Sequence, residues 1–141
     1  MIEYKKIFVD TAPFIYYIEQ NPEYFDKAKR FFMQAYENDV ELITSVITME
    51  EYLVFPYRNN SHYYISLFDR LITTLGIKVV SIDEVIAKKA AGIRAEYKAF
   101  KAMDALQIAT AMISGCDLFL TNDKQLRQFR DVKCITVDEW E

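Results

Sequence analysis

The chain alternates short apolar runs with longer segments in which hydrophobic residues recur every three or four positions. The short runs predict strands and cover 7–9, 41–45, 77–80, 118–120 and 132–137. The longer segments predict helices and cover 11–18, 25–36, 46–54, 65–75, 83–97, 102–114 and 124–129. Strands separated by helices indicate an α/β fold in which helices cover both faces of a parallel sheet.

Proline, glycine and asparagine mark where several of these segments end. The Asn21-Pro22 pair breaks the first helix, and Pro56 with the polar residues 59–61 predicts another break. Gly76 is the expected C-terminal stop of the helix before it. The sequence contains no linker-like stretch, internal repeat or low-complexity tract, so we expect one domain over residues 1–141.

The composition narrows the class of protein. A hydrophobic content of 52% in 141 residues is enough for one buried core. No apolar stretch reaches the ~18 residues of a membrane-spanning helix, and residues 1–6 lack the apolar run of a signal peptide. We therefore expect a cytoplasmic protein without a membrane segment. Cys116 and Cys134 lack the spacing of a metal site and are expected to be buried thiols.

The formal net charge of −4 argues against a protein that coats nucleic acid, because such proteins are usually basic as whole domains. It does not exclude a nuclease. Bound divalent cations and a few local Lys or Arg residues can bring phosphates to an acidic site. The overall charge is therefore nearly uninformative about catalysis.

Two aspartates stand at the ends of predicted strands. Asp10 ends the first strand, and Asp123 follows the fourth after Thr121 and Asn122. Ligands of open parallel sheets bind beyond the carboxyl ends of the strands, so both acids occupy the edge where a site is expected. Each could equally be the N-cap of the helix that follows it, because Asp is a preferred N-cap residue.

Two further acids lie in predicted helices. Asp104 interrupts the otherwise apolar or small segment 102–113 near its first turn. An acid in such surroundings needs a cation, hydrogen-bond donors or the helix N-terminal dipole nearby. The other comes from the pair Glu50 and Glu51, and helical periodicity does not decide which of them faces inward. Exposure to solvent is the ordinary alternative for either glutamate.

Several carboxylates at one site raise one another's pKa, so keeping them ionised at neutral pH requires cations. Oxygen ligands favour Mg²⁺ or Mn²⁺, whereas Zn²⁺ usually takes Cys or His ligands. The sequence has a single histidine, His62, in a polar stretch, which leaves little scope for histidine-based hydrolysis. Its three glycines form no phosphate-binding cluster. Metal-assisted phosphodiester hydrolysis fits what remains.

Four short segments carry these acids in a characteristic order. They are Val9-Asp10-Thr11 followed by Phe14-Ile15, then Ser45 to Glu51, then Asp104 to Ala111, and last Leu120-Thr121-Asn122-Asp123. In content, order and separation they resemble the motifs of the PIN-domain family, and in particular of the VapC-like toxins of bacterial and archaeal toxin–antitoxin pairs. The spacing of the acid from Ser45 in that family selects Glu51 over Glu50.

The resemblance implies a three-layer α/β/α sandwich around a central parallel sheet. It also implies an endoribonuclease that cleaves single-stranded RNA with Mg²⁺ or Mn²⁺. Asp10 and Asp104 would then be the principal metal ligands, and Glu51 and Asp123 would complete the acidic pocket directly or through water.

The resemblance also suggests supporting residues. Thr121 and Asn122 would support the site, although an ordinary strand-end threonine and turn asparagine are the alternatives. Basic residues near the two later acidic motifs would contact RNA phosphates, although a solvated charged face is the alternative for each of them. These residues are Lys98, Lys101, Lys124 and Arg127.

The implied partners are an RNA substrate and a cognate antitoxin protein. The chain is rich in aromatic residues, most of which we expect in the core and a minority at a homodimer surface or an antitoxin groove; those singled out are Tyr16, Tyr17, Tyr52, Phe55, Tyr57, Tyr63 and Tyr64. A housekeeping RNA-processing nuclease of the same fold is an alternative. A non-catalytic RNA-binding or protein-interaction module is another, but it predicts the loss of one or more acids, and all four are present.

Overall fold

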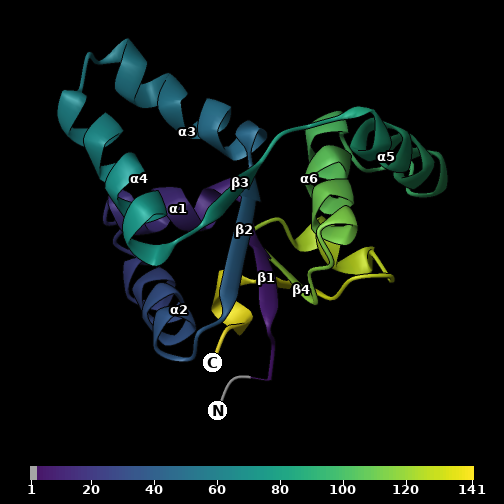
Figure 1. Cartoon of the computed structure of the whole chain (residues 1–141), viewed down its shortest axis with the longest axis horizontal. Helices are drawn as coiled ribbons and strands as arrows, with labels where there is room; N and C mark the ends of the chain where they lie inside the picture. The colour runs from purple at the N-terminus through teal and green to yellow at the C-terminus, as the bar shows by residue number, and fades with distance from the viewer. Residues whose placement is uncertain (1–2) are drawn as a thin grey trace.

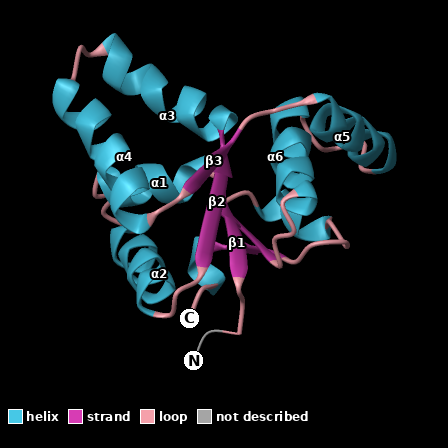
Figure 2. Cartoon of the chain, viewed as in Figure 1, coloured by secondary structure: helices cyan, strands magenta, loops and turns pink. Residues whose placement is uncertain are grey.

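The computed structural model describes residues 3–141, which form one sheet with helices on both sides (Figures 1 and 2). The strands are β1 (Lys6–Val9), β2 (Glu41–Ser45), β3 (Lys78–Val80), β4 (Leu118–Thr121) and β5 (Cys134–Thr136). The helices are α1 (Thr11–Ile18), α2 (Phe25–Glu37), α3 (Val46–Arg58), α4 (His62–Leu75), α5 (Glu84–Glu96) and α6 (Ala102–Ile113), with 3-10 helices η1 (Lys124–Gln128) and η2 (Val137–Glu139).

The five strands are all parallel and lie in the order β3-β2-β1-β4-β5. Figure 1 shows α1 to α4 on one side of the sheet and α5 and α6 on the other, which confirms the predicted three-layer α/β/α sandwich. The chain builds the sheet outward from β1 to β3, then returns through α5 and α6 to place β4 beside β1. The strand order therefore reverses between β1 and β4, where such sheets have a crevice beyond the strand ends.

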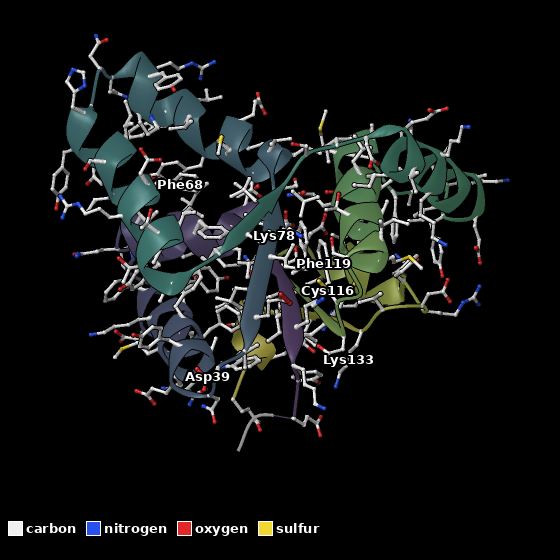
Figure 3. All side chains as sticks on the ribbon, viewed as in Figure 1. Asp39, Phe68, Lys78, Cys116, Phe119 and Lys133 are labelled. Carbon is white, nitrogen blue, oxygen red and sulfur yellow. The ribbon has the colours of Figure 1, made fainter. Side chains whose placement is uncertain are left out.

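The two sides of the sheet have separate hydrophobic cores, because successive residues of a strand point to opposite faces. On β1, Ile7 and Val9 pack with the helices α1 to α4, whereas Phe8 packs with α5 and α6. On β4, Phe119 joins Phe8, and the two rings stack with centroids 5.1 Å apart. Figure 3 labels Phe119 on the α6 side and Phe68 on the α4 side. The central strands are buried on both faces, which explains their continuous apolar sequence.

Local signals fix several helix ends. The Ser45 hydroxyl accepts a hydrogen bond from the Ile47 backbone N–H (3.0 Å) at the start of α3, and Asp83 accepts one from Ile86 (2.9 Å) at the start of α5. These side chains satisfy backbone donors that have no partner inside the helix. Gly76 ends α4 with a left-handed φ of 62°, which confirms the predicted stop.

The predicted break between the two helices is confirmed at residues 59–61, but the helix predicted to end at residue 54 continues through Pro56 to Arg58. Pro56 is buried in the last turn of the helix. Because it lacks a backbone N–H, it removes one helical hydrogen bond there, but the helical backbone continues past it. The chain turns only beyond Arg58, at Asn59 and Asn60. Asn60 has a φ of 49°, a left-handed conformation that asparagine tolerates better than most residues.

The remaining expectations concern residues outside the acidic motifs. No helix among residues 3–141 is long and apolar enough to cross a membrane. Cys116 and Cys134 are free and buried, as expected, and burial raises the pKa of both thiols to about 12. His62 is exposed at the start of α4.

The seven aromatic residues singled out from the sequence do not lie mostly in the core. Tyr52 is buried and donates its hydroxyl to the Tyr64 carbonyl oxygen (2.8 Å), while Tyr17 and Tyr64 are half-buried against the same core. Tyr16 is half-buried elsewhere. The three exposed residues are Phe55, Tyr57 and Tyr63. The α3–α4 hairpin thus presents aromatic side chains to the surface.

Candidate active site

Asp10 lies where β1 ends and α1 begins. Its backbone N–H donates to the Leu120 carbonyl oxygen of β4 (2.9 Å), which fixes it at the reversal of strand order. Its carboxylate accepts from the Thr11 N–H (2.9 Å) and from the Thr121 hydroxyl (2.8 Å). Asp10 is therefore a helix N-cap and a residue of the sheet edge at once, and the two interpretations of its position do not exclude each other.

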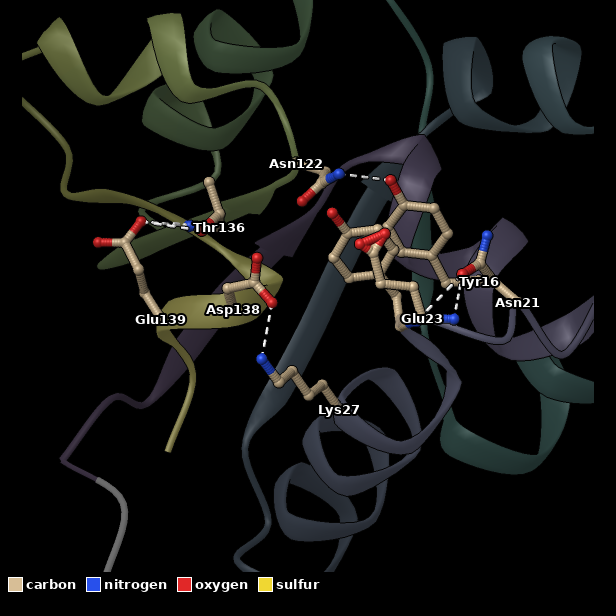
Figure 4. Close-up of polar contacts among 9 residues, drawn as sticks. Tyr16, Asn21, Glu23, Lys27, Asn122, Thr136, Asp138 and Glu139 are labelled. Atoms are coloured by element: carbon tan, nitrogen blue, oxygen red, sulfur yellow. Dashed lines mark hydrogen bonds and ion pairs between the residues drawn. The ribbon is translucent and has the colours of Figure 1, made fainter.

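The loop after β4 carries the second acid of the sheet edge. Asp123 caps η1 by accepting from the Gln125 N–H (2.9 Å), and its own N–H donates to the Thr121 hydroxyl oxygen (3.1 Å). The Asn122 amide donates to the hydroxyl oxygen of Tyr16 on α1 (Figure 4). The loop is thus attached both to its own strand and to the helix that follows Asp10.

The two glutamates on α3 differ in whether they line the pocket that contains Asp10. Both side chains are exposed, but Glu51 accepts a hydrogen bond from the Thr11 hydroxyl and lines the same pocket as Asp10, whereas Glu50 does not line it. Periodicity could not make this choice, because it depends on how α3 leaves β2 and packs beside α1. The glutamate in the pocket is therefore Glu51, the one that the family spacing selected.

Asp104 lies in the first turn of α6, partly buried. Burial raises the pKa of its carboxyl above the ordinary value of 3.8, and the charges of Asp123 and Glu51 raise it further. The Lys101 backbone and side chain act in the opposite direction. Asp104 therefore benefits from the helix N-terminus, as one interpretation expected, and still lies within the electrostatic reach of the other acids.

The four acids come from four separate segments and line one open pocket of about 460 Å³ at the carboxyl edge of the sheet. No two of the segments that carry them are adjacent in the sequence, and the pocket lies at the reversal of strand order. Its lining residues are Asp10, Thr11, Ala12, Tyr16, Glu51, Asp104, Thr121, Asn122, Asp123 and Lys124.

The pocket is electrostatically unfavourable for its own acids. Burial raises the pKa of Asp10 from 3.8 to about 6; hydrogen bonds from Thr11, Thr121 and Gln107 lower it, and the charge of Glu51 raises it. Carboxylates whose pKa is raised by burial and mutual repulsion are stabilised in the ionised form by a cation. The charge distribution therefore fits a divalent ion.

The donor chemistry fits Mg²⁺ or Mn²⁺, because the pocket offers carboxylate and hydroxyl oxygens, and no cysteine or histidine lines it. Among residues 3–141, no three Asp, Glu, His or Cys side chains stand close enough to surround a single ion as placed. Mg²⁺ usually binds through one or two carboxylates and keeps several waters, so it does not need a cage of three protein ligands. Asp10 and Asp104 would hold it, and Glu51 and Asp123 would complete the acidic pocket directly or through water.

The basic residues expected to contact RNA are only partly gathered here. Lys124 lines the pocket, and Lys101 lies at the N-cap of α6, beside Asp104. Arg127 is turned toward Glu139, with an N–O distance of 3.4 Å, and neither it nor Lys98 lines the pocket. The structure thus favours Lys124 and Lys101 over Arg127 and Lys98 as residues near a bound phosphate.

Sequence reasoning gave no role to three polar residues that connect two of the acids. Thr11, Thr48 and Gln107 are buried, and their hydrogen bonds join Asp10 to Glu51. A signal for Gln107 was present, since it is the one amide in the apolar segment after Asp104 and lies one turn further along α6. Tyr16 was singled out only as an aromatic residue, but it lines the pocket and its hydroxyl oxygen accepts from the Asn122 amide.

The chain is similar to several proteins of known structure and to one protein family. No curated protein matches the chain in sequence. Among solved structures, FitAcB from Neisseria gonorrhoeae is similar, with a TM-score of 0.74 and 22% identity over 94% of this chain and 99% of that chain. VapC20 from Mycobacterium tuberculosis, a sarcin-ricin loop cleaving toxin, has a TM-score of 0.68 and 18% identity over 90% of this chain and 98% of that chain.

A toxin–antitoxin complex from Klebsiella pneumoniae is also similar, with a TM-score of 0.67 and 22% identity over 93% of this chain and 97% of that chain. At such identities these structures show the shared fold. The PIN domain family itself matches residues 7–132, from β1 through the loop after β4, a range that includes all four acids. This chain belongs to the PIN domain family.

Proposed function

We propose that this protein is a divalent-metal-dependent endoribonuclease that cleaves single-stranded RNA in the cytoplasm as the toxin of a type II toxin–antitoxin pair. The observation that carries the proposal is the convergence of Asp10, Glu51, Asp104 and Asp123 on one pocket. Membership of the PIN domain family supports it. So does the similarity to VapC20, which is described as a sarcin-ricin loop cleaving toxin.

The chemistry follows from the residues of the pocket. A bound Mg²⁺ or Mn²⁺ would polarise a phosphodiester and lower the pKa of an attacking water. Asp10 and Asp104 would hold the ion, and the Thr121 hydroxyl keeps one oxygen of Asp10 in place at 2.8 Å. Lys124, at the rim, would attract the phosphate, which the acids by themselves would repel.

The proposed partners are an antitoxin and a second copy of the chain. The similar solved structures include toxin–antitoxin complexes, among them that from Klebsiella pneumoniae. On this chain, the exposed residues Phe55, Tyr57 and Tyr63 give the α3–α4 hairpin the aromatic surface typical of protein interfaces. A housekeeping RNA-processing nuclease would share the pocket, so the toxin role needs a test of its own.

The first test is cleavage of a mixed single-stranded RNA pool by the purified protein with Mg²⁺, with Mn²⁺ and with EDTA. Losing a residue that only hydrogen-bonds to a metal ligand typically lowers metal affinity or activity ~10–100-fold. Asp10→Asn and Asp104→Asn would remove a ligand itself, so each is expected to reduce cleavage by more than ~100-fold. Glu50→Gln is the matched control, because it removes an exposed carboxylate next to Glu51 and should leave the rate nearly unchanged. Metal-independent cleavage, or equal activity of all variants, would contradict the proposal.

The toxin role is tested by expression in growing bacterial cells. The wild type is expected to arrest growth, and the folded Asp10→Asn variant is expected not to. Normal growth with a wild type that cleaves RNA in vitro would instead favour the housekeeping nuclease.

A further inference from the structure

Gln107 occupies an unusual place for an amide side chain. It lies on α6, one turn beyond Asp104, and is only 2% exposed. Its amide nitrogen lies 3.3 Å from Asp10 Oδ1 and 2.8 Å from the Thr48 hydroxyl oxygen, and its carbonyl oxygen accepts a hydrogen bond from the Ser45 hydroxyl. All three partners lie at or just beyond the ends of β1 and β2, far from α6 in the sequence.

The direction of these hydrogen bonds is determined by chemistry. The Ser45 hydroxyl oxygen already accepts from the Ile47 N–H (3.0 Å), so its own hydrogen is free to donate to the Gln107 carbonyl. An ionised Asp10 can only accept, so the amide must turn its NH₂ group toward Asp10. The reverse orientation would place two acceptor oxygens against each other. The Gln107 side chain therefore has one favourable arrangement, which points a donor at Asp10.

The same network reaches Glu51, a second acid of the pocket. The Thr48 hydroxyl, which accepts from Gln107, lies 3.3 Å from the Thr11 hydroxyl, and Thr11 donates to Glu51. A continuous chain of hydrogen bonds, buried at its centre and part-buried at the two acids, thus joins Asp10 to Glu51 through Gln107. Both ends receive donors, and among residues 3–141 no buried polar side-chain atom lacks a partner.

Packing by itself does not account for this residue. A buried amide is unfavourable unless it is hydrogen-bonded, and an apolar side chain of similar size would fill the same space. Thr110, on the same helix and equally buried, shows the purely local solution, since its hydroxyl donates to the Leu106 carbonyl of its own helix (2.7 Å). Gln107 differs because all its partners lie on other elements and one of them is an acid of the pocket.

We propose that Gln107 is a positioning residue that holds Asp10 and, through Thr48 and Thr11, Glu51 in the arrangement that receives the divalent cation. The inference rests on the proposed metal-dependent function and assigns the orientation of the acids to one buried amide. Gln107 itself lies behind the carboxylates and does not line the pocket. Outer hydrogen-bond partners of this kind set the orientation of metal ligands.

The test measures Mn²⁺ affinity of the purified full chain by titration followed by electron paramagnetic resonance, at a temperature where every variant is folded. Gln107→Met keeps a side chain of similar length but removes the donors, and it is expected to weaken Mn²⁺ binding ~10-fold or more. Thr110→Val is the matched control on α6 and is expected to bind Mn²⁺ as the wild type does. Should Gln107→Met fail to fold, Gln107→Asn retains an amide that is one methylene too short to reach Asp10, and it is expected to lose affinity in the same direction.

A second arm tests the connection to Glu51. Thr11→Val interrupts the chain between Thr48 and Glu51 without changing the shape of the side chain. If Thr11 and Gln107 act through one network, their effects on Mn²⁺ affinity are not independent. The loss of affinity in the double variant is then expected to be at least ~3-fold smaller than the product of the two single losses. Independent effects would overturn the connection between the two acids.

The outcomes separate this inference from the function on which it rests. If the wild type cleaves RNA with metal but Gln107→Met binds Mn²⁺ as tightly as Thr110→Val, the positioning role is overturned and the nuclease stands. If the wild type neither binds Mn²⁺ nor cleaves RNA, the proposed function is overturned, and the role of Gln107 with it. A purely structural role would lower the unfolding temperature of Gln107→Met while leaving the Mn²⁺ affinity of the folded protein intact.

Discussion

At the scale of the residue, Asp10 combines opposite demands of folding and chemistry. Its position at the end of β1 is fixed by the backbone bond to Leu120, and its carboxylate is partly withdrawn from water beside Glu51. The ionised form is therefore unfavourable in the metal-free protein, and the pKa rises to about 6. The same feature prepares the site for a cation, because bound positive charge relieves both burial and repulsion.

This conflict predicts a pH-dependent stability difference. Because the folded pKa of about 6 lies above the ordinary value of 3.8, the folded state binds the proton more tightly, so stability increases as pH falls from above 6 toward 4. The shift corresponds to at most ~3 kcal/mol. Asp10→Asn is therefore expected to raise the metal-free unfolding free energy at pH 8 by ~1–3 kcal/mol over the wild type, and this difference should shrink toward pH 4. Urea denaturation across this range measures it.

Asp69→Asn, on the exposed side of α4, is the control and should change stability by less than ~0.5 kcal/mol at every pH. A metal-free Asp10→Asn variant less stable than the wild type at pH 8 would show that the hydrogen bonds of the carboxylate outweigh its burial.

At the scale of the element, the ends of strands and helices do the positioning. The Asn122 side chain ties the β4 loop to Tyr16 of α1 (Figure 4), and the Thr121 hydroxyl donates to Asp10. Ser45 caps α3 and donates its hydroxyl to the Gln107 carbonyl oxygen. These contacts depend on the positions of the helix ends, because Asp10, Ser45 and Asp123 are the N-caps of α1, α3 and η1. Backbone conformation at these ends therefore matters as much as side-chain identity.

The two helix glycines with open surroundings test this point in opposite directions. Neither Gly76 nor Gly92 has a neighbouring atom within 4 Å of an added Cβ, so only backbone effects distinguish them. Gly76→Ala places a side chain at a φ of 62° and is expected to cost ~1 kcal/mol. Gly92→Ala lies inside α5 and is expected to stabilise the protein by ~0.5–1 kcal/mol. Thermal denaturation of both variants gives the comparison, and a shift of the same sign for both would refute it.

At the scale of the whole molecule, two cores share one sheet. Phe8 and Phe119 form a stacked pair under α6, while the neighbouring residues of the same strands pack against α1 to α4. A substitution that loosens the packing on either side therefore affects β1, which leads to Asp10, and β4, which ends at Thr121. Three aromatic residues of the α3–α4 hairpin contribute little to these cores because their side chains are exposed to solvent; they are Phe55, Tyr57 and Tyr63.

Two phenylalanine truncations separate these roles. Phe119→Ala removes a fully buried ring and is expected to reduce the unfolding free energy by ~3–5 kcal/mol. Phe55→Ala removes a side chain that is 52% exposed and is expected to cost less than ~1 kcal/mol. Chemical denaturation measures both, and light scattering of Phe55→Ala shows whether the exposed ring supports association between copies. A Phe55→Ala variant as unstable as Phe119→Ala would place that ring in a core.

The sequence by itself determined the alternation of strands and helices, the parallel sheet and the edge at which Asp10 and Asp123 meet. These properties follow from local periodicity and from the rule that parallel strands end at one edge, so they need no knowledge of distant contacts. Even there, the helix end predicted before Pro56 is wrong, because a proline in the last helical turn removes one hydrogen bond without ending the helix.

Only the tertiary structure decided which polar residues meet. Glu50 and Glu51 have equivalent helical surroundings in the sequence, and the packing of α3 beside α1 turns Glu51 toward the pocket. Gln107 and Asp10 are 97 positions apart, and no local pattern records that the amide faces the carboxylate. The same holds for Arg127, which looks like a phosphate contact in the sequence but pairs with Glu139. Side-chain partners of this kind are set when distant segments pack together, since a hydrogen bond depends on distance and direction rather than on order along the chain.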